Sequence, residues 1–519
     1  LHSILRTYRK QNKPMCKLHE FVSIHINDTH PVLAIPELMR ILLDEEGMSW
    51  EEAWDVTTKT ISYTNHTTLS EALEKWPIRL FQPLLPRIYM IVEEINERFC
   101  QHLYPGEWKR IEDMAIIAHD QVKMAHLAIA GSHSVNGVAH LHTEILKKRE
   151  MNNFYQVSPE KFNNKTNGIT HRRWLMKANP ELSHLISESI GDKWQVDPVH
   201  MKELERFSKD SSFLKKLEKV KANNKLKLAE RIKEQNGITV NPDSIFDVQV
   251  KRLHAYKRQL LNVLHIMYLY NRMKEEPNFK PYPRTFIFGA KASPGYYYAK
   301  KIIKLINTIA DKVNNDPDTN DYLKVIFLEN YRVSLAEEIF PAAELSEQIS
   351  TASKEASGTG NMKFMMNGAL TIGTMDGANV EIFERVGENH IFTFGLTSEE
   401  VMDYNAHGGY HSSEYYMLDR RIHQAVNQLI NGFFPNTSGM FDMIYDSLLL
   451  ENDQYFVLRD FGAYVSTQEK VEAHYQDKKN WNTSSVINIA NSGYFSSDRT
   501  ITEYATDIWN VKPVSSMNK

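Results

Sequence analysis

Residues 246–258 read FDVQVKRLHAYKR, a short strand-like run that leads directly into a dense group of cations. Three further strand-like runs of four to six residues follow at 285–288, 323–328 and 369–373. Between the runs the sequence has helical apolar spacing, at residues 257–274, 295–314 and 335–340. Strands that alternate with helices predict an α/β fold whose doubly wound, mostly parallel sheet is covered on both faces.

The sequence on either side of this α/β region is mostly helical. One strand-like run lies at 21–26, and amphipathic stretches follow at 35–43, 70–74, 86–99 and 111–130. A charged helical stretch spans 210–235, and helices return after about residue 400, the last at 500–509. We expect a helix-rich domain at 1–168, a Rossmann-like domain at 169–485, and a terminal helical segment at 486–519 that packs back toward the first domain.

The composition indicates a folded globular protein with more than one domain. Of the 519 residues, 42% are hydrophobic and 24% are charged, which excludes a disordered or collagen-like chain. The formal net charge of −4 gives no reason to expect nucleic acid or an anionic membrane as a partner. Two cysteines and the lack of a long apolar run fit a reducing, cytoplasmic setting. The chain opens on Leu1, so we expect that an upstream segment is missing.

The densest chemical signal is EASGTGNMK at residues 355–363. A Gly-Thr-Gly turn ahead of a helix at 361–368 exposes backbone N–H groups, which favour a bound anion such as phosphate. An ordinary loop-to-helix junction would look the same, because a lone Gly-x-Gly is common. Lys363 lies in the first turn of this helix, so its amine should lie near whatever anion the turn binds.

A second signal follows the strand-like run 246–250. Lys251, Arg252, Lys257 and Arg258, together with His254 and Tyr256, lie at the carboxyl end of a strand and could gather phosphate groups. The alternative is a solvated basic surface at a helix start. The helix dipole disfavours cations at that end, so an anion is needed to compensate them.

Two weaker signals complete the set. The sequence ENYR at 329–332 follows a strand directly, and KTNGIT at 165–170, with Trp174 beyond it, lies at the expected domain boundary. We expect these groups and the two clusters to face one inter-domain cleft. No metal site is predicted, because the acidic run 316–321 lacks the glycine of a calcium loop.

The run EASGTGNMKFMMN at 355–367 resembles the pyridoxal-phosphate attachment signature of the glycogen and maltodextrin phosphorylases. The resemblance extends through six further motifs: NDTHP (27–31), YTNHT (63–67), NKTNGIT (164–170), KRLHAYKRQ (251–259), FLENYRVSLAE (327–337) and FSSDRTI (495–501). It implies the two-domain GT-B architecture, pyridoxal 5′-phosphate as the cofactor, and a homodimer in the full-length enzyme.

The resemblance also implies a role for particular residues. Lys363 would carry the cofactor as a Schiff base. The other residues implied around the cofactor are Lys251, Lys257, Gly358, Thr359, Gly360, Trp174, Tyr331 and Arg332. Arg252 and Lys257 would bind the substrate phosphate. The residues implied at the glucosyl unit are His66, Asn167, Tyr256, Glu355, Ala356, Ser357 and Gly358.

The reaction that the resemblance implies is phosphorolysis of an α-1,4-glucan to glucose 1-phosphate with retained configuration. The cofactor phosphate would relay a proton to the substrate phosphate. The residues implied in catalysis are Lys363, Arg252, Lys257, His66 and Glu355, with Glu355 as a sugar hydroxyl partner instead of a nucleophile.

Two alternatives stay open. One is a glucan- and pyridoxal-binding fragment without catalysis, because the family's Gly-rich phosphate loop lies upstream of Leu1. The other is an aminotransferase-like enzyme, which would not need two phosphate-gathering clusters.

Overall fold

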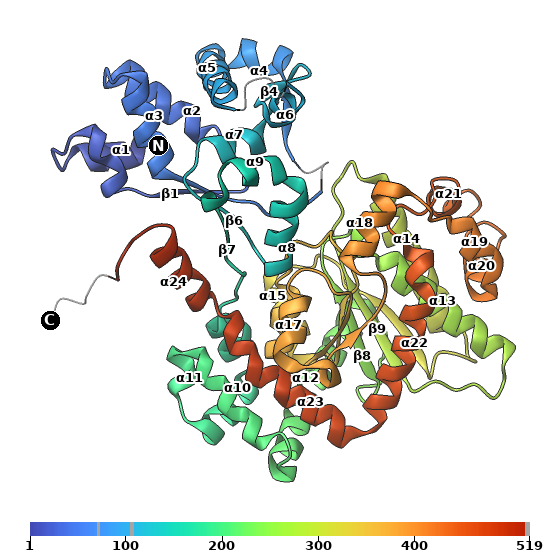
Figure 1. Cartoon of the computed structure of the whole chain (residues 1–519). Coiled ribbons are helices and arrows are strands. Elements are labelled where there is room, and N and C mark those ends of the chain that lie inside the picture. Colours follow the sequence, from blue (N-terminus) through green and yellow to red (C-terminus); the bar gives the residue numbers. More distant parts are fainter. Residues whose placement is uncertain (70–72, 104–107, 514–519) are drawn as a thin grey trace. The chain divides into compact units, whose positions relative to one another are not determined.

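The computed structural model describes residues 1–69, 73–103 and 108–513, and these residues form two compact units. Unit 1 contains Leu1–Thr166 and the chain from Thr500 onward, and unit 2 contains Asn167–Arg499. Figure 1 shows both units, coloured along the sequence. No helix among the described residues is both long enough and apolar enough to span a bilayer.

Unit 2 is built on a six-stranded sheet in which every pair of neighbours is parallel. The strand order is β10-β9-β8-β11-β12-β13. The strands are β8 (Ile245–Val250), β9 (Arg284–Gly289), β10 (Leu323–Phe327), β11 (Leu345–Gln348), β12 (Leu370–Gly373) and β13 (Phe392–Thr393). The chain therefore runs outward from β8 in one direction and then from β11 in the other. The prediction of an α/β fold with a doubly wound parallel sheet is confirmed, and it is consistent with the GT-B architecture.

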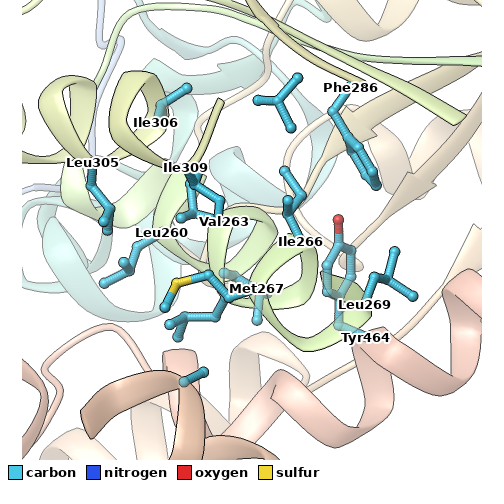
Figure 2. Packing of buried hydrophobic residues seen from close by; sticks show 14 of the residues in the cluster. Leu260, Val263, Ile266, Met267, Leu269, Phe286, Leu305, Ile306, Ile309 and Tyr464 are labelled. Atoms are coloured by element: carbon cyan, nitrogen blue, oxygen red, sulfur yellow. The ribbon is translucent and has the colours of Figure 1, made fainter. Parts of the chain in front are cut away.

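Helices cover both faces of this sheet. Successive strand residues point to opposite faces, so each strand contributes side chains to both cores. In β9, Phe286 and Phe288 pack into one core, whereas Ile287 packs into the other. In the first core, α13 (Gln259–Glu275) and α14 (Tyr297–Asn315) meet through aliphatic side chains such as Val263 and Ile309 (Figure 2). The second core includes residues of α12 (Ser211–Asn236), α15 (Val333–Ala342), α16 (Gly360–Met366) and α23 (Lys478–Asn491).

Most of the predicted helices of unit 2 are confirmed within a few residues. The last predicted helix appears as α24 (Ser497–Asp507), which begins three residues before the predicted start and lies mostly in unit 1. The remaining helices of unit 2 are α10 (Pro180–Ile190), α11 (Lys193–Val196), α17 (Asn379–Val386), α18 (Ser398–His407), α19 (Ser412–Leu418), α20 (Arg420–Asn427), α21 (Asp442–Leu449) and α22 (Val457–Gln476).

Unit 1 combines helices with two small sheets, so the expectation of a single strand there was wrong. A parallel sheet has the order β1-β2-β6-β7, and an antiparallel sheet has the order β3-β5-β4. These strands are β1 (Ile24–Asn27), β2 (Ile61–Thr64), β3 (Lys75–Pro77), β4 (Ile117–Ala118), β5 (Gln121–Lys123), β6 (Val135–Gly137) and β7 (Phe162–Asn164). The predicted strand at 21–26 is therefore displaced toward Asn27.

The helices of unit 1 confirm the predicted stretches at 35–43 and 86–99 but not the one at 111–130. They are α1 (His2–Arg9), α2 (Ala34–Arg40), α3 (Trp50–Thr60), α4 (Ile78–Leu84), α5 (Pro86–His102), α6 (Trp108–Met114), α7 (Met124–Ala130), α8 (His140–Ile145) and α9 (Asn152–Val157). His119 and Asp120 adopt left-handed backbone angles, with φ of 52° and 57°, and turn the chain into the β4–β5 hairpin between α6 and α7. Residues 70–72 of the predicted helix 70–74 lie outside the described residues.

Candidate active site

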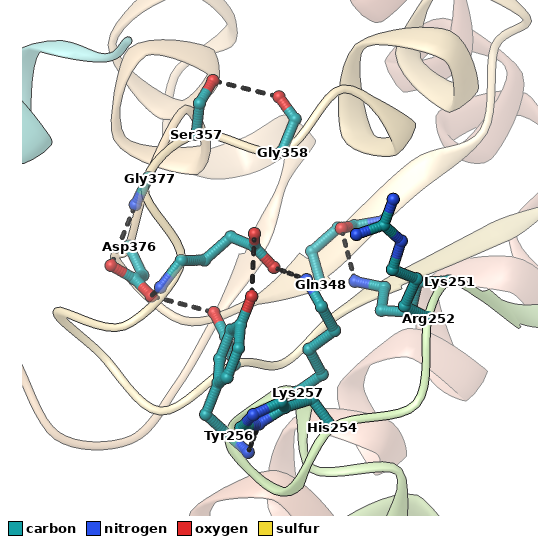
Figure 3. A network of polar contacts seen from close by, with 12 residues as sticks. Lys251, Arg252, His254, Tyr256, Lys257, Gln348, Ser357, Gly358, Asp376 and Gly377 are labelled. Carbon is teal, nitrogen blue, oxygen red and sulfur yellow. Dashed lines mark hydrogen bonds and ion pairs between the residues drawn. The ribbon is translucent and has the colours of Figure 1, made fainter. Parts of the chain in front are cut away.

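The candidate site of unit 2 lies where the sheet order reverses, at the carboxyl ends of β8 and β11. This is the switch point at which open α/β sheets bind ligands. Lys251 follows β8, and its Nζ donates a hydrogen bond to Oε1 of Gln348, the last residue of β11, at 2.8 Å (Figure 3). Burial, and then the charge of Lys257, lowers the pKa of Lys251 to about 8. The two strand ends are therefore joined by a hydrogen bond from a buried amine.

An ion pair joins the turn after β8 to the segment after β11. Lys257, in the 3₁₀ turn Ala255–Lys257, lies 2.5 Å from Oε2 of Glu355. The hydroxyl of Tyr256 donates to the other oxygen of Glu355 at 3.4 Å. Burial opposes both charges, but the pair outweighs it, so the pKa of Lys257 is raised and that of Glu355 is lowered. Both groups are therefore charged near neutral pH.

The two arginines of the predicted cation cluster have different surroundings. Arg252 is exposed, and its guanidinium has no hydrogen-bond or ion-pair partner among the residues that the structure describes. Arg258 is buried and donates to Oδ2 of Asp460 at 2.7 Å and to the carbonyl of Ile349 at 2.8 Å. The prediction that all four cations gather phosphate was therefore wrong for Arg258, whose donors are taken up inside the protein.

Lys363 is the fourth residue of α16, and its amine is half-buried among aromatic rings. Its Nζ lies 4.3 Å from the ring centre of Trp174, which belongs to the π-helical turn Arg172–Lys177. Lys363 Nζ also donates a hydrogen bond to Thr359 Oγ1 at 3.3 Å. No carboxylate pairs with this amine in the described part of the chain. Burial lowers the pKa of Lys363 to about 8, so its amine loses its proton more readily than that of an ordinary lysine.

Gln348 brings the Lys251 amine close to the glycine-rich turn. A Cβ placed on Gly360 would find only Gln348 Nε2 within 4.0 Å, so the space beside this glycine is open. Gly358 has a left-handed φ of 76°, a conformation that a side chain would strain. Ser357 Oγ donates to the carbonyl of Gly358 at 3.0 Å (Figure 3). The Gly358–Gly360 turn therefore lies close to both the Lys251 and the Lys363 amines.

Several predicted site residues are not joined to these contacts. Tyr331 lies beside Gly289, the last residue of β9. A Cβ added to this glycine would be 3.4 Å from the Cβ of Tyr331. Arg332 is exposed and donates to the carbonyl of Asn330. The carbonyl of Asn167 accepts from Arg499 at 3.4 Å, and Ala356 is buried beside Glu355.

His66 belongs to unit 1, and its surroundings are known within that unit. Its Nε2 makes a short hydrogen bond with Asn27 Oδ1, which joins the two motifs at 27–31 and 63–67. Burial lowers the pKa of His66. The imidazole is therefore neutral near pH 7.

Three buried polar residues at this site were missed by the sequence analysis. Gln348 accepts from Lys251, and Asn367 donates to the carbonyls of Trp174 and Lys363 at 2.8 and 2.9 Å. Asp376, the third residue after β12, accepts a hydrogen bond from the backbone N–H of Glu355 at 2.8 Å. A signal existed for Asp376, because a carboxylate shortly after a sheet strand lies at the ligand-binding edge. Within the described residues there is no cluster of three side chains that could ligate a metal ion.

Comparisons with known proteins identify the family of the chain. Residues 1–511 match the phosphorylase family, described as carbohydrate phosphorylase. The chain is 66% identical to the glycogen phosphorylase of Bacillus subtilis (strain 168), over 99% of its own length and 65% of the relative's. It is 52% and 53% identical to the muscle forms of glycogen phosphorylase from Bos taurus and Homo sapiens, over 95% of its own length.

The chain spans 65% of the length of the bacterial relative and 59% of the length of each muscle enzyme. The match to the family nevertheless covers nearly all of the 519 residues and includes every motif around Lys251, Glu355 and Lys363. The chain therefore belongs to the carbohydrate phosphorylase family.

Proposed function

We propose that the protein is an α-glucan phosphorylase, which uses inorganic phosphate to release glucose 1-phosphate from the non-reducing end of an α-1,4-glucan. The observation that carries this proposal is the half-buried Lys363 amine beside a glycine-rich turn and the Lys251–Lys257 cluster. Relatives named glycogen phosphorylase support it, although the chain spans only 65% and 59% of their lengths.

The residues around Lys363 fit pyridoxal 5′-phosphate. The amine lies over the Trp174 ring and has no acidic partner among the described residues, so it is available to condense with an aldehyde. The open space beside Gly360 and the buried Lys251 amine suit its phosphate. The bound cofactor would supply a phosphate group that gives a proton to the substrate phosphate and takes it back.

The cations of the site would hold the substrate phosphate. The Arg252 guanidinium has no partner among the described residues, and its planar fork can bind two phosphate oxygens at once. Lys257 is fixed by Glu355, so its position is set before substrate binds. Two phosphates close together repel each other strongly in a site of low dielectric, and cations fixed in advance offset this repulsion. Arg252 and Lys257 would therefore stabilise the phosphate that attacks the sugar.

Glu355 and the turn that follows it would orient the glucosyl unit. Each oxygen of Glu355 accepts one hydrogen bond, from Tyr256 or Lys257, and keeps a lone pair that can accept from a sugar hydroxyl, so we assign Glu355 this role and not that of a retaining nucleophile. Instead, a phosphate oxygen would form the new bond to the anomeric carbon. The glycosidic bond would break with its electrons moving to the leaving oxygen, which takes a proton from the phosphate. His66, Asn167, Ala356, Ser357 and Gly358 remain proposed contacts of the sugar.

The pH dependence of cofactor attachment should report the lowered pKa of Lys363. Burial favours the neutral amine, so its reactive form should already predominate above pH 8. We expect the rate of covalent pyridoxal loading of the cofactor-free protein to rise about tenfold per pH unit below pH 8 and then level off. Nα-acetyl-lysine, treated in parallel, should keep rising to about pH 10. The same continued rise in the protein would contradict a buried amine.

Replacing Arg252 with lysine should weaken the response to phosphate. Lysine keeps the charge but loses the fork, and a charge-assisted hydrogen bond contributes about 1.5–3 kcal/mol. We expect the KM for phosphate to rise at least tenfold while the pyridoxal content stays unchanged. Arg420→Lys is the control, because this exposed arginine pairs with Glu275 and is no part of the candidate site. An unaltered phosphate KM in Arg252→Lys would exclude the role proposed for its fork.

The overall proposal is tested by incubating the pyridoxal-loaded protein with maltoheptaose and phosphate and measuring glucose 1-phosphate. Phosphate-dependent release is the expected result. Binding of glucan and pyridoxal without release would support the non-catalytic alternative, and amino-group transfer would support the aminotransferase-like one. Initial rates on maltoheptaose and on glycogen would identify the preferred glucan. A homodimer and a cytoplasmic setting remain part of the proposal.

A further inference from the structure

The segment after β12 lies directly behind the loop that carries Glu355. Residues 374–379 contact this loop at several successive points. The Ala378 N–H donates to the carbonyl of Ser357 at 2.9 Å. A Cβ on Gly377 would lie 2.8 Å from the Ser357 carbonyl oxygen and 2.9 Å from that of Glu355, so only glycine fits there. The two segments are therefore in backbone contact.

Asp376 provides the strongest of these contacts. Its Oδ1 accepts from the N–H groups of Ser353 and Gly377 at 2.9 and 3.0 Å. Its Oδ2 accepts from the Ser350 hydroxyl at 2.9 Å and from the Glu355 N–H at 2.8 Å. Figure 3 shows Asp376 in this position, beside Gly377. Four donors thus meet one buried carboxylate, which is only 2% exposed.

The loop that Asp376 binds needs such support. Ser353 has a left-handed φ of 76°, which is strained for a residue other than glycine. The carboxylate accepts the Ser353 N–H and the Glu355 N–H at the same time, so it fixes the backbone on both sides of Lys354. The side-chain carboxylate of Glu355 forms an ion pair with Lys257 and accepts a hydrogen bond from Tyr256. The backbone of Glu355 is therefore set by Asp376 and its side chain by the turn after β8.

We infer that Asp376 is a positioning residue for the proposed reaction, which holds the Glu355 loop in the geometry that receives the glucosyl unit. In this role it acts through the backbone of Glu355 and Ser353. The kinetic part of this inference rests on the proposed function, whereas its structural part does not. Asn379 extends the same support, because it accepts from Asn361 in α16 at 3.0 Å and donates to the Gln348 carbonyl at 3.1 Å.

The test is Asp376→Asn, which keeps the shape but leaves one oxygen to serve four donors. We expect faster amide hydrogen exchange at Ser353 or at Glu355, because the bonds to one of the two oxygens are lost and each oxygen binds one of these N–H groups. We also expect kcat for phosphorolysis to fall at least tenfold, with the phosphate KM within twofold of the parent and an unchanged pyridoxal content. A loss that is merely structural would lower stability and pyridoxal content together.

Asp453→Asn is the matched control. Asp453 is also buried and accepts from the Tyr410 hydroxyl at 2.7 Å and the Leu458 N–H at 2.8 Å, but it binds no residue of the Glu355 loop. We expect a similar loss of thermal stability with kcat within twofold of the parent. Equal kcat values for the two variants would overturn the inference.

Gly377→Ala decides the question if Asp376→Asn does not fold. Its methyl group would push against the Glu355 and Ser357 carbonyls while Asp376 stays in place. We expect the same fall in kcat with an unaltered phosphate KM, and a parent-like kcat would overturn the inference. Unchanged exchange at Ser353 and Glu355 in Asp376→Asn would also overturn it. If exchange increases but the parent releases no glucose 1-phosphate, the positioning role stands and the proposed reaction fails.

Discussion

Replacement of Lys363 with alanine is expected to abolish covalent pyridoxal attachment and phosphate-dependent turnover together. Alanine cannot form the bond to the cofactor aldehyde, and Lys363 is the only lysine in α16. Its amine is also the one that lies over Trp174 with a pKa lowered by burial, which makes it reactive near neutral pH. Borohydride reduction of the loaded protein, followed by peptide mapping, should place the pyridoxyl group on the peptide that contains Lys363.

Lys354→Ala is the control for this experiment. Lys354 lies nine residues upstream in the same segment, and it should be dispensable for labelling because its backbone, not its amine, joins the loop contacts. We expect full labelling and turnover in this variant. A pyridoxyl group on another lysine of Lys363→Ala, with turnover retained, would show that the cofactor assignment is wrong.

The sequence predicted the α/β fold of unit 2 because its apolar strands stand out between amphipathic helices. Four of the six strands were recognised. The strand β11 was missed because Ser346, Glu347 and Gln348 interrupt its apolar pattern, although all three are buried. Two of them are bound by residues from distant segments, Gln348 by Lys251 and Glu347 by Tyr464. Such partners cannot be identified from the local sequence.

Part of the candidate site was also predicted from the sequence. Lys251, Lys257, Glu355 and Lys363 were identified from motifs, and the structure brings Lys257 and Glu355 together as expected for a shared site. Arg258 was misassigned because charge alone does not distinguish a ligand-binding arginine from a buried structural one. The β4–β5 hairpin was also missed, since its turn is formed by His119 and Asp120 without the usual glycine.

The structural role of Arg258 leads to the second large effect, on stability. Its guanidinium donates to Asp460 and to the carbonyls of Ile349, Ser350 and Phe456. Arg258→Met would leave these acceptors, including a buried carboxylate, without their donor. Removal of one partner of a buried ion pair costs about 3–5 kcal/mol. We expect the free energy of unfolding, measured by urea denaturation, to fall by about this amount.

Two further variants separate the charge from the packing. Arg258→Met with Asp460→Asn removes the unpaired charge and keeps an acceptor for the Leu396 N–H, so it should be more stable than Arg258→Met alone. Arg420→Met removes an exposed arginine that pairs with Glu275 at 3.3 Å, and it should change stability by less than about 1 kcal/mol. If Arg258→Met and Arg420→Met were equally stable, Arg258 would not tie the end of β11 to α22. Ser350 would then be held by its contacts with Asp376 and Thr374.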